Sequence, residues 1–327
     1  MKKLTDASAV LPAVALSAAG PVTTLPAALV AVEPPVRLLP RPSLAGGLVR
    51  TARPRQWVKN LLVFAAPGAA GVLTHGAVVA RTVVAFGVFC VAASGVYFLN
   101  DAADAELDRG HPTKWLRPVA AGIVPERLAV TLGAALLFVS VAAALSLGWH
   151  FAVAVAAYAA VNVAYDVRLR REPVFDLAAV ASGFVIRAIA GGLATGVPLS
   201  EWFLVVISAA SLFVVAGKRE PATVGMGAST GSRVAYPLSF LRYIRLLASG
   251  VAVTAYCLWA FDKAAMAGRS MWFEVTIVPF ALAILRYALL VENGEGGSPE
   301  DILLGDRTIA VLVVAWAALF ALGVYGA

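Results

Sequence analysis

Three carboxylates lie close together at the end of the second long apolar segment of the sequence. In the run Asn100-Asp101-Ala-Ala-Asp104-Ala-Glu-Leu-Asp108 they are spaced i, i+3 and i+7, so a continuous helix would present them on one face. Like charges in this arrangement repel one another unless a cation lies between them. Mg²⁺ binds carboxylate oxygens and keeps coordination positions for phosphate oxygens. The spacing therefore predicts a magnesium–phosphate site; the alternative is a solvated acidic helix end.

Basic residues follow these carboxylates directly. The next segment reads His111-Pro-Thr-Lys114-Trp-Leu-Arg117-Pro. A departing diphosphate accumulates negative charge, which a metal ion and neighbouring cations neutralise together. Lys114 and Arg117 are therefore expected to bind a diphosphate substrate beside the metal. The alternative is that they only anchor a loop at the membrane surface.

Other polar residues stand in apolar surroundings. A second cluster reads Tyr165-Asp166-Val-Arg168-Leu-Arg170-Arg171-Glu-Pro-Val-Phe-Asp176, and Asp176 enters the next apolar segment. Arg187 lies deeper in that segment, where a charge needs a partner or a wet cavity. Its partner could be a buried acid, or a lipid phosphate or substrate. Lys59 lies one turn inside the first apolar segment, from which it can point into a helix bundle.

The composition identifies the solvent of the chain as lipid. Of its 327 residues, 61% are hydrophobic and 14% are charged, whereas soluble domains carry about 25% charged residues. Apolar runs of about 20 residues indicate membrane helices rather than barrel strands. We expect an all-α polytopic membrane protein with a disordered extension over 1–47 and a membrane domain over 48–327. The apolar segments are 57–74, 78–100, 127–147, 150–167, 174–197, 202–217, 243–262, 272–291 and 307–326.

The distribution of positive charge predicts the orientation. If the N-terminus is cytosolic, all but five of the 26 Lys and Arg lie in cytosolic segments, as the positive-inside rule requires. The exceptions are Arg81, Lys263 and Arg269 in external connections, and Arg187 and Arg286 within helices. The polar loops 101–126, 168–173, 218–242 and 292–306 then face the cytosol. A net charge of +7 fits loops that face anionic lipid, and we expect no nucleic-acid partner.

Several motifs together resemble the UbiA superfamily of intramembrane prenyltransferases, and within it the branch that transfers phosphoribosyl groups to decaprenyl phosphate. The resemblance covers about residues 48–326. Its motifs are Arg53-Pro-Arg-Gln-Trp-Val-Lys59-Asn60, Asn100 to Asp108 with His111-Pro-Thr-Lys114 and Arg117-Pro-Val-Ala-Ala-Gly122, Arg187-Ala-Ile-Ala-Gly-Gly, Gly217-Lys218-Arg219, Leu258-Trp-Ala-Phe261, Pro279-Phe, Leu285-Arg286-Tyr287, and Pro299-Glu300-Asp301 with Asp306-Arg307.

The resemblance implies nine helices around a central cavity, Mg²⁺, phosphoribosyl pyrophosphate (PRPP) as donor and decaprenyl phosphate as acceptor, with a product used for cell-wall arabinan. It gives the magnesium-pyrophosphate role to Asn100, Asp101, Asp104 and Asp108, here called the acidic cluster. The other residues expected to bind substrate are Lys59, Lys114, Arg117, Tyr165, Arg170, Asp176, Arg187, Lys218 and Arg219. Two departures are Arg170, where the family usually has Lys, and Asp166, where the branch is generally not acidic.

Two other functions fit parts of the sequence. An aromatic prenyltransferase would carry the diphosphate on a prenyl donor, although the many cations suit two phosphate-bearing substrates better. A transporter would use Arg187 and the acids as an ion path, but such proteins usually show internal repeats, and none is evident by eye. We expect a plasma-membrane protein with a cytosolic active site. The sequence does not determine the oligomeric state, and a homo-oligomer is one possibility.

Overall fold

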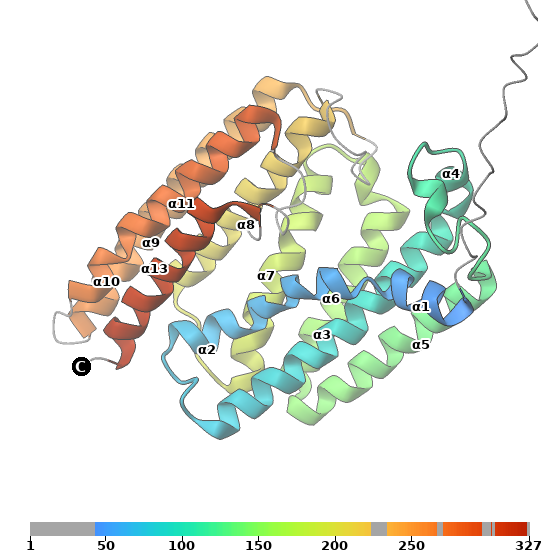
Figure 1. Cartoon of the computed structure of the whole chain (residues 1–327). Coiled ribbons are helices and arrows are strands. Elements are labelled where there is room, and N and C mark those ends of the chain that lie inside the picture. The colour runs from blue at the N-terminus through green and yellow to red at the C-terminus, as the bar shows by residue number, and fades with distance from the viewer. Residues whose placement is uncertain (1–42, 224–233, 267–270, 296–301, 303–304, 326–327) are drawn as a thin grey trace, which may run out of the picture. The chain divides into compact units, whose positions relative to one another are not determined.

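The computed structural model describes residues 43–223, 234–266, 271–295, 302 and 305–325, and every regular element within them is helical (Figure 1). The expected all-α fold is thereby confirmed. The predicted extension lies outside the described residues as far as residue 42, and so do parts of the loops 218–242 and 292–306. Helix α1, Leu44–Ala52, spans the predicted boundary between extension and membrane domain.

Eight stretches are long and apolar enough to cross a membrane, by length and composition. Their large apolar side chains point outward, as in Phe138, Leu246 and Val314, which are 76%, 74% and 68% exposed. Such a surface is stable against lipid tails but not against water. The elements that form these stretches are α3 Gly76–Ala103, α5 Glu126–Ala144 with η3 Leu145–Leu147, α6 Trp149–Val167, α7 Phe175–Thr195, α8 Glu201–Thr223, α9 Leu238–Met266, α10 Met271–Val275 with α11 Ile277–Leu290 and the π-helical turn η5 Val291–Glu295, and α13 Arg307–Tyr325.

The first predicted segment differs from this pattern. In place of one helix over 57–74, the chain forms a 3₁₀ helix η1, Pro54–Phe64, and a single turn α2, Ala65–Ala69. The expectation of a membrane-length helix here was wrong. Gly68 and Gly71 follow Pro67 closely, and Gly71 adopts a left-handed conformation that ends the helix. Runs of 3₁₀ helix longer than three or four residues are uncommon, so contacts with neighbouring helices must hold η1 in place.

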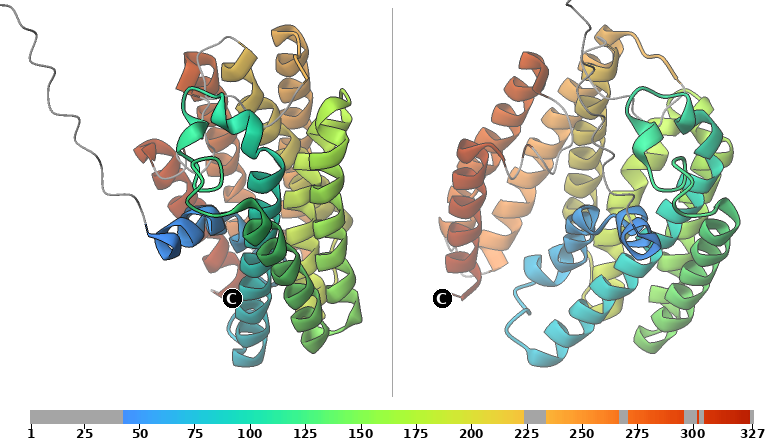
Figure 2. Two further views of the ribbon diagram at one scale, coloured as in Figure 1. Left: turned by 90° about the vertical axis from the view of Figure 1, so that its right-hand side faces the viewer. Right: turned by 45° about the vertical axis from the view of Figure 1, so that its right-hand side comes forward.

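Close backbone contacts at glycine bring these helices together. Gly191 of α7 meets η1 so tightly that a Cβ atom there would lie 1.9 Å from the Val63 carbonyl oxygen. Helices α3 and α5 pack through Gly95 and Gly133. A Cβ atom added at either glycine would lie 3.0 Å from the carbonyl oxygen of the other. Small residues allow such approaches in membrane proteins. Figure 2 shows α3, α5, α6 and α7 running side by side.

Candidate active site

The acidic cluster spans a break between two helices. Helix α3 ends at Ala103, Asp104 has a non-helical conformation, and the short helix α4 runs over Ala105–Arg109. The three carboxylates therefore do not share one face of a continuous helix, which corrects the sequence-based picture. Asp101 and Asp108 are nevertheless buried, at 1% and 4% exposure. The break lets Asp104 face a different partner from the other two.

An arginine binds each of the three carboxylates. Arg117 Nη1 lies 2.7 Å from Asp108 Oδ2 and 3.4 Å from Asp101 Oδ1, so one guanidinium nitrogen bridges two acids. Asp101 also forms an ion pair with Arg53. Arg170 Nη1 donates to both carboxylate oxygens of Asp104, at 2.8 and 3.0 Å. The positive charge that these acids require is thus supplied within the chain.

Arg53 is a site residue that the sequence analysis did not select. It joins α1 to η1 in a left-handed conformation, with φ 53° and ψ 59°, which is uncommon for residues other than glycine. Its guanidinium lies 4.9 Å from the centre of the Tyr97 ring and binds Asp101. The available signal was its position in the Arg-Pro-Arg run beside the motif containing Lys59.

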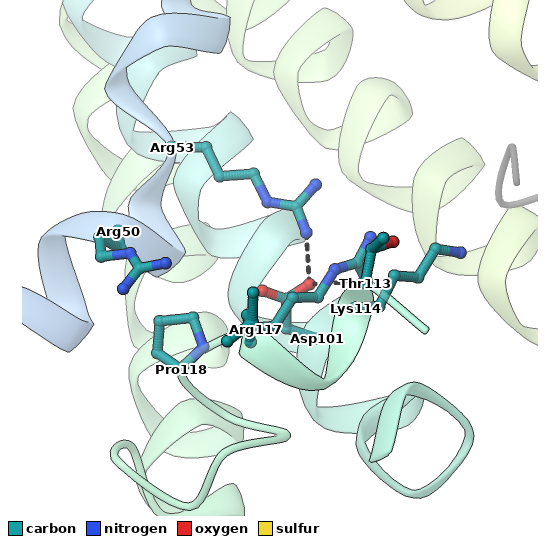
Figure 3. A pocket seen from close by; sticks show the side chains of 8 residues that line it. Arg50, Arg53, Asp101, Thr113, Lys114, Arg117 and Pro118 are labelled. Carbon is teal, nitrogen blue, oxygen red and sulfur yellow. Dashed lines mark hydrogen bonds and ion pairs between the residues drawn. The ribbon is translucent and has the colours of Figure 1, made fainter. Parts of the chain in front are cut away.

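A pocket of about 280 Å³ opens beside Asp101. Figure 3 shows the Arg53 guanidinium reaching into it toward Asp101, with Arg117 next to the carboxylate and Lys114 on the far side. Burial lowers the pKa of Lys114, and the neighbouring Arg117 charge lowers it further. Its lining residues are Arg50, Arg53, Asp101, Thr113, Lys114, Leu116, Arg117 and Pro118.

The second polar motif contacts the first. Asn100 Nδ2 donates to Asp166 Oδ1 at 2.7 Å, which links the end of α3 to the end of α6. Arg170 belongs to η4, Leu169–Arg171, and reaches Asp104 from the same side. It is buried, and its Nε–H has no acceptor among the described residues. The two motifs therefore form one continuous polar region, as their joint role in substrate binding would require.

Asp176 lies at the centre of a further buried network. Arg219 Nη2 lies 2.9 Å from Asp176 Oδ2 and donates to the Tyr165 hydroxyl at 3.2 Å. The Tyr236 hydroxyl donates to Asp176 and accepts from the Val174 backbone N–H. Burial, together with the hydrogen bond to Asp176, raises the pKa of Tyr236 to about 12. Sequence analysis missed Tyr236, because it lies outside the recognised motifs.

Arg187 is separate from these networks. It is 6% exposed and donates to Asn60 Oδ1, the Gly183 carbonyl oxygen and the Tyr158 hydroxyl at 2.7, 2.7 and 2.8 Å. Its guanidinium also lies 4.5 Å from the centre of the Tyr158 ring. No carboxylate of the described residues pairs with it, so the buried acid anticipated from the sequence is not its partner there. Neutral acceptors solvate its charge.

Two other residues predicted to bind substrate, Lys59 and Lys218, lie beside side chains of their own helices. Lys59 Nζ donates to Gln56 Oε1 within η1, three residues earlier in the chain. Lys218 is half-buried in α8, next to Arg219. The expected roles of both residues in substrate binding stay predictions.

The acidic cluster has the donor chemistry for a magnesium ion. Its oxygens are the hard ligands that Mg²⁺ prefers. Arg117 Nη1 shows that a cation fits between Asp101 and Asp108. Within the described part of the chain, however, no three acidic, histidine or cysteine side chains converge on one point. A metal would therefore be held by two carboxylates here, with its remaining positions left to phosphate oxygens or water.

Comparison with known proteins identifies the family. A model of the UbiA prenyltransferase family matches residues 61–300. This chain belongs to that family. The resemblance seen in the sequence motifs is confirmed, and the polytopic membrane fold follows with it.

The UbiA chain has well-matched relatives over most of its length. It is 43% identical to the decaprenyl-phosphate phosphoribosyltransferase of Mycolicibacterium smegmatis, over 88% of this chain and 95% of that protein. It is 44% identical to the protein of the same name from Mycobacterium tuberculosis, over 85% and 94% of the two chains. Among solved structures, a UbiA homolog from Archaeoglobus fulgidus bound to GPP and Mg²⁺ is similar in fold, with a TM-score of 0.60, 18% identity, and coverage of 86% of this chain and 100% of that one.

Proposed function

We propose that this UbiA-family chain transfers the 5-phosphoribosyl group of PRPP to decaprenyl phosphate and releases pyrophosphate. The observation that carries the proposal is its identity of 43–44% with relatives named decaprenyl-phosphate phosphoribosyltransferase, over nearly their whole length. The polar region supports it independently, because carboxylates and a surplus of arginines lie together there. Such a site suits two substrates that both carry phosphate.

The acidic cluster would hold the pyrophosphate through magnesium. Asp101 and Asp108 already share one cation, Arg117, and Asn100 and Asp104 lie on the same segment. When bound, Mg²⁺ neutralises charge on the pyrophosphate and makes it a better leaving group. With the charge of Asp101 and Asp108 balanced in this way, the Arg117 guanidinium would be available to the phosphate oxygens. Guanidinium groups bind phosphate well because their N–H donors match its oxygens in pairs.

The reaction would be a displacement at C1 of the ribose. A phosphate oxygen of the lipid forms the new bond to C1, and the bond from C1 to the pyrophosphate oxygen breaks with its electron pair. Positive charge develops on the sugar, as in glycosyl transfer generally. Inversion gives the β-linked lipid. The lipid phosphate is already ionised near neutral pH, so the site needs no general base.

The lipid phosphate needs a cation of its own. Lys59, Arg170 and Arg187 were the candidates from sequence, and their surroundings now differ. Arg170 has an uncommitted Nε–H beside the acidic cluster, whereas the Nε, Nη1 and Nη2 of Arg187 each hold an acceptor. We therefore favour Arg170 for this role. The enzyme would work in the plasma membrane with this region facing the cytosol, where PRPP is made.

One assay separates this proposal from prenyl transfer. Purified protein in detergent receives radiolabelled PRPP and decaprenyl phosphate, with or without Mg²⁺, and label is followed into the organic phase. Magnesium-dependent transfer to lipid, with release of pyrophosphate, is the expected result. Absence of transfer by protein of native size and helix content would contradict it. A prenyl diphosphate with a small aromatic acceptor is the next substrate pair to test.

A further inference from the structure

The pocket beside Asp101 carries more positive charge than the acidic cluster explains. Arg50 and Arg53 come from α1 and its end, and Lys114 and Arg117 come from η2, Lys114–Leu116, and the residue after it. Asp101 is the one carboxylate among the lining residues. We call the space bounded by these four cations the cation pocket. Figure 3 shows Arg50 on one side and Lys114 on the other, with Asp101 and Arg117 between them.

The ion pairs use only half of this charge. Arg53 pairs with Asp101, and Arg117 pairs with Asp101 and Asp108. Within the described residues, the side chains of Arg50 and Lys114 form neither an ion pair nor a hydrogen bond. Two positive charges are therefore left facing one pocket. An anion bound there would balance both.

Lys114 does not behave as a surface anchor. A lysine that only anchors a loop extends its ammonium group into water or to lipid headgroups. The Lys114 side chain is instead half-buried, and its pKa is lowered by loss of solvation and by the charge of Arg117, which together outweigh the opposing effect of Asp108 and Asp104. Holding a partly desolvated cation next to another cation is unfavourable. An anionic ligand would remove that penalty.

The walls of the pocket are built by tight packing between distant segments. Helix α1 rests on the loop before α5 at Gly47, where a Cβ atom would lie 2.8 Å from Ile123 Cγ2. The Ser94 hydroxyl of α3 accepts from Trp57 Nε1–H of η1 at 3.2 Å and lies 3.2 Å from the Ala52 carbonyl oxygen at the end of α1. Arg53, with its left-handed backbone conformation, is the next residue in the chain. The arginines on this wall are thus carried by backbone that neighbouring elements fix in place.

We propose that the cation pocket binds a phosphate monoester, as a subsite that adjoins the pyrophosphate site on the acidic cluster and shares Asp101 with it. The inference rests on the proposed function, in which each substrate carries one such group: the 5-phosphate of PRPP and the phosphate of the lipid. A prenyl diphosphate and an aromatic acceptor carry none. Arg50, Arg53 and Lys114 supply charge-assisted donors to the monoester, while Thr113 contributes a hydroxyl. This subsite would select phosphoribosyl chemistry over prenyl chemistry.

The test removes the two unpaired charges one at a time. Arg50→Gln and Lys114→Gln are compared with Arg127→Gln, which removes an exposed arginine of α5 outside the pocket, and with Arg50→Lys, which keeps the charge. Steady-state assays give kcat and the KM for each substrate. The thermal stability of each purified variant is measured with ribose 5-phosphate, with decaprenyl phosphate in detergent, and with ribose as the uncharged probe.

We expect a rise of about tenfold in one KM for each Gln variant, the size of one lost charge-assisted hydrogen bond. Arg50→Lys keeps the charge but loses the paired donors, so its KM should rise less than that of Arg50→Gln. Arg127→Gln should stay close to the parent. Protection by ribose 5-phosphate that the Gln variants lose would assign the pocket to the donor. Loss of protection by decaprenyl phosphate would assign it to the acceptor. Unchanged KM values and unchanged protection, in an enzyme that turns over PRPP, would overturn the subsite. If the parent does not use PRPP at all, loss of protection by ribose 5-phosphate still supports the subsite while the proposed reaction fails.

Discussion

The arginines at the acidic cluster and Arg187 are held in opposite ways. At the acidic cluster, Arg53 and Arg117 bind carboxylates, and their side chains are 28% and 27% exposed beside a pocket. In the membrane interior, Arg187 is 6% exposed and binds only neutral acceptors from η1, α6 and α7. The first group neutralises charge at an open surface. Arg187 instead joins three helical segments.

The difference indicates which contacts can be exchanged during a reaction. A carboxylate released by Arg117 can accept a metal ion, and the arginine can turn to the phosphates that arrive with it, so charge stays balanced throughout. Arg187 has no such exchange, because moving it would leave Asn60 Oδ1 and the Tyr158 hydroxyl without their donor in the buried interior of the protein. The acidic cluster is therefore suited to chemistry, and the Arg187 network is suited to holding η1 on α7. Four predictions test this contrast.

The largest effect is expected at Asp101. Asp101→Asn should lower turnover about a thousandfold, because it removes charge from the proposed metal and pyrophosphate site. Glu106→Gln is the matched control, since Glu106 is an exposed acid of α4. Turnover is measured by label transfer, and folding by circular dichroism and gel filtration. An Asp101→Asn enzyme with near-normal turnover would remove the chemical side of the contrast.

Asp166 should act through Asn100. Its carboxylate holds the Asn100 amide N–H at 2.7 Å, which directs the amide oxygen away from Asp166 and leaves it available to a metal. Loss of a group that orients a ligand typically weakens metal binding about 10–100-fold. Asp166→Ala should therefore raise the Mg²⁺ concentration needed for half-maximal activity by that factor, with saturating Mg²⁺ restoring most turnover. A fixed loss at every Mg²⁺ concentration would speak for direct contact with substrate.

Arg187 should matter for stability rather than for substrate affinity. Arg187→Met leaves the Asn60 amide oxygen and the Tyr158 hydroxyl without their donor, at a cost of about 1–3 kcal/mol for each buried group. We expect a lower melting temperature in detergent and an unchanged KM for both substrates in the folded fraction. A double-mutant cycle with Asn60→Ala should show that the two effects are not additive. A raised KM for the lipid without loss of stability would return Arg187 to the substrate site.

The smallest effect should appear at alkaline pH through Tyr236. Its pKa is about 12 in the folded protein, against about 10 for an unperturbed tyrosine. Because the folded value is raised, its contribution to stability is complete below pH 10 and declines as the pH rises toward 12. The difference in stability between the parent and Tyr236→Phe should therefore be constant up to about pH 10 and shrink above it. A difference that shrinks below pH 9 would contradict the assignment.

Local composition was enough to predict much of this protein. The length and apolarity of each segment determine whether it is stable in lipid, so eight membrane-length stretches could be located from their residues alone. The chemical types in the run from Asn100 to Asp108, with Lys114 and Arg117 after it, indicated a metal and phosphate site. Both inferences depend on residues that are near one another in the sequence, so they can be made without the tertiary structure.

Tertiary structure decided which charges meet. Arg53 reaches Asp101 across 48 residues of sequence, and Arg170 reaches Asp104 across 66; no local pattern encodes either pairing. The break at Asp104 and the conversion of the first apolar segment into η1 also depend on neighbours, including the close contact of Val63 with Gly191. The sequence determines whether a segment lies in lipid or in water, because the free energy of transfer into lipid is nearly the sum of the contributions of its residues. The partner of a buried charge is determined by packing between distant segments, and this packing cannot be obtained by adding contributions of single residues.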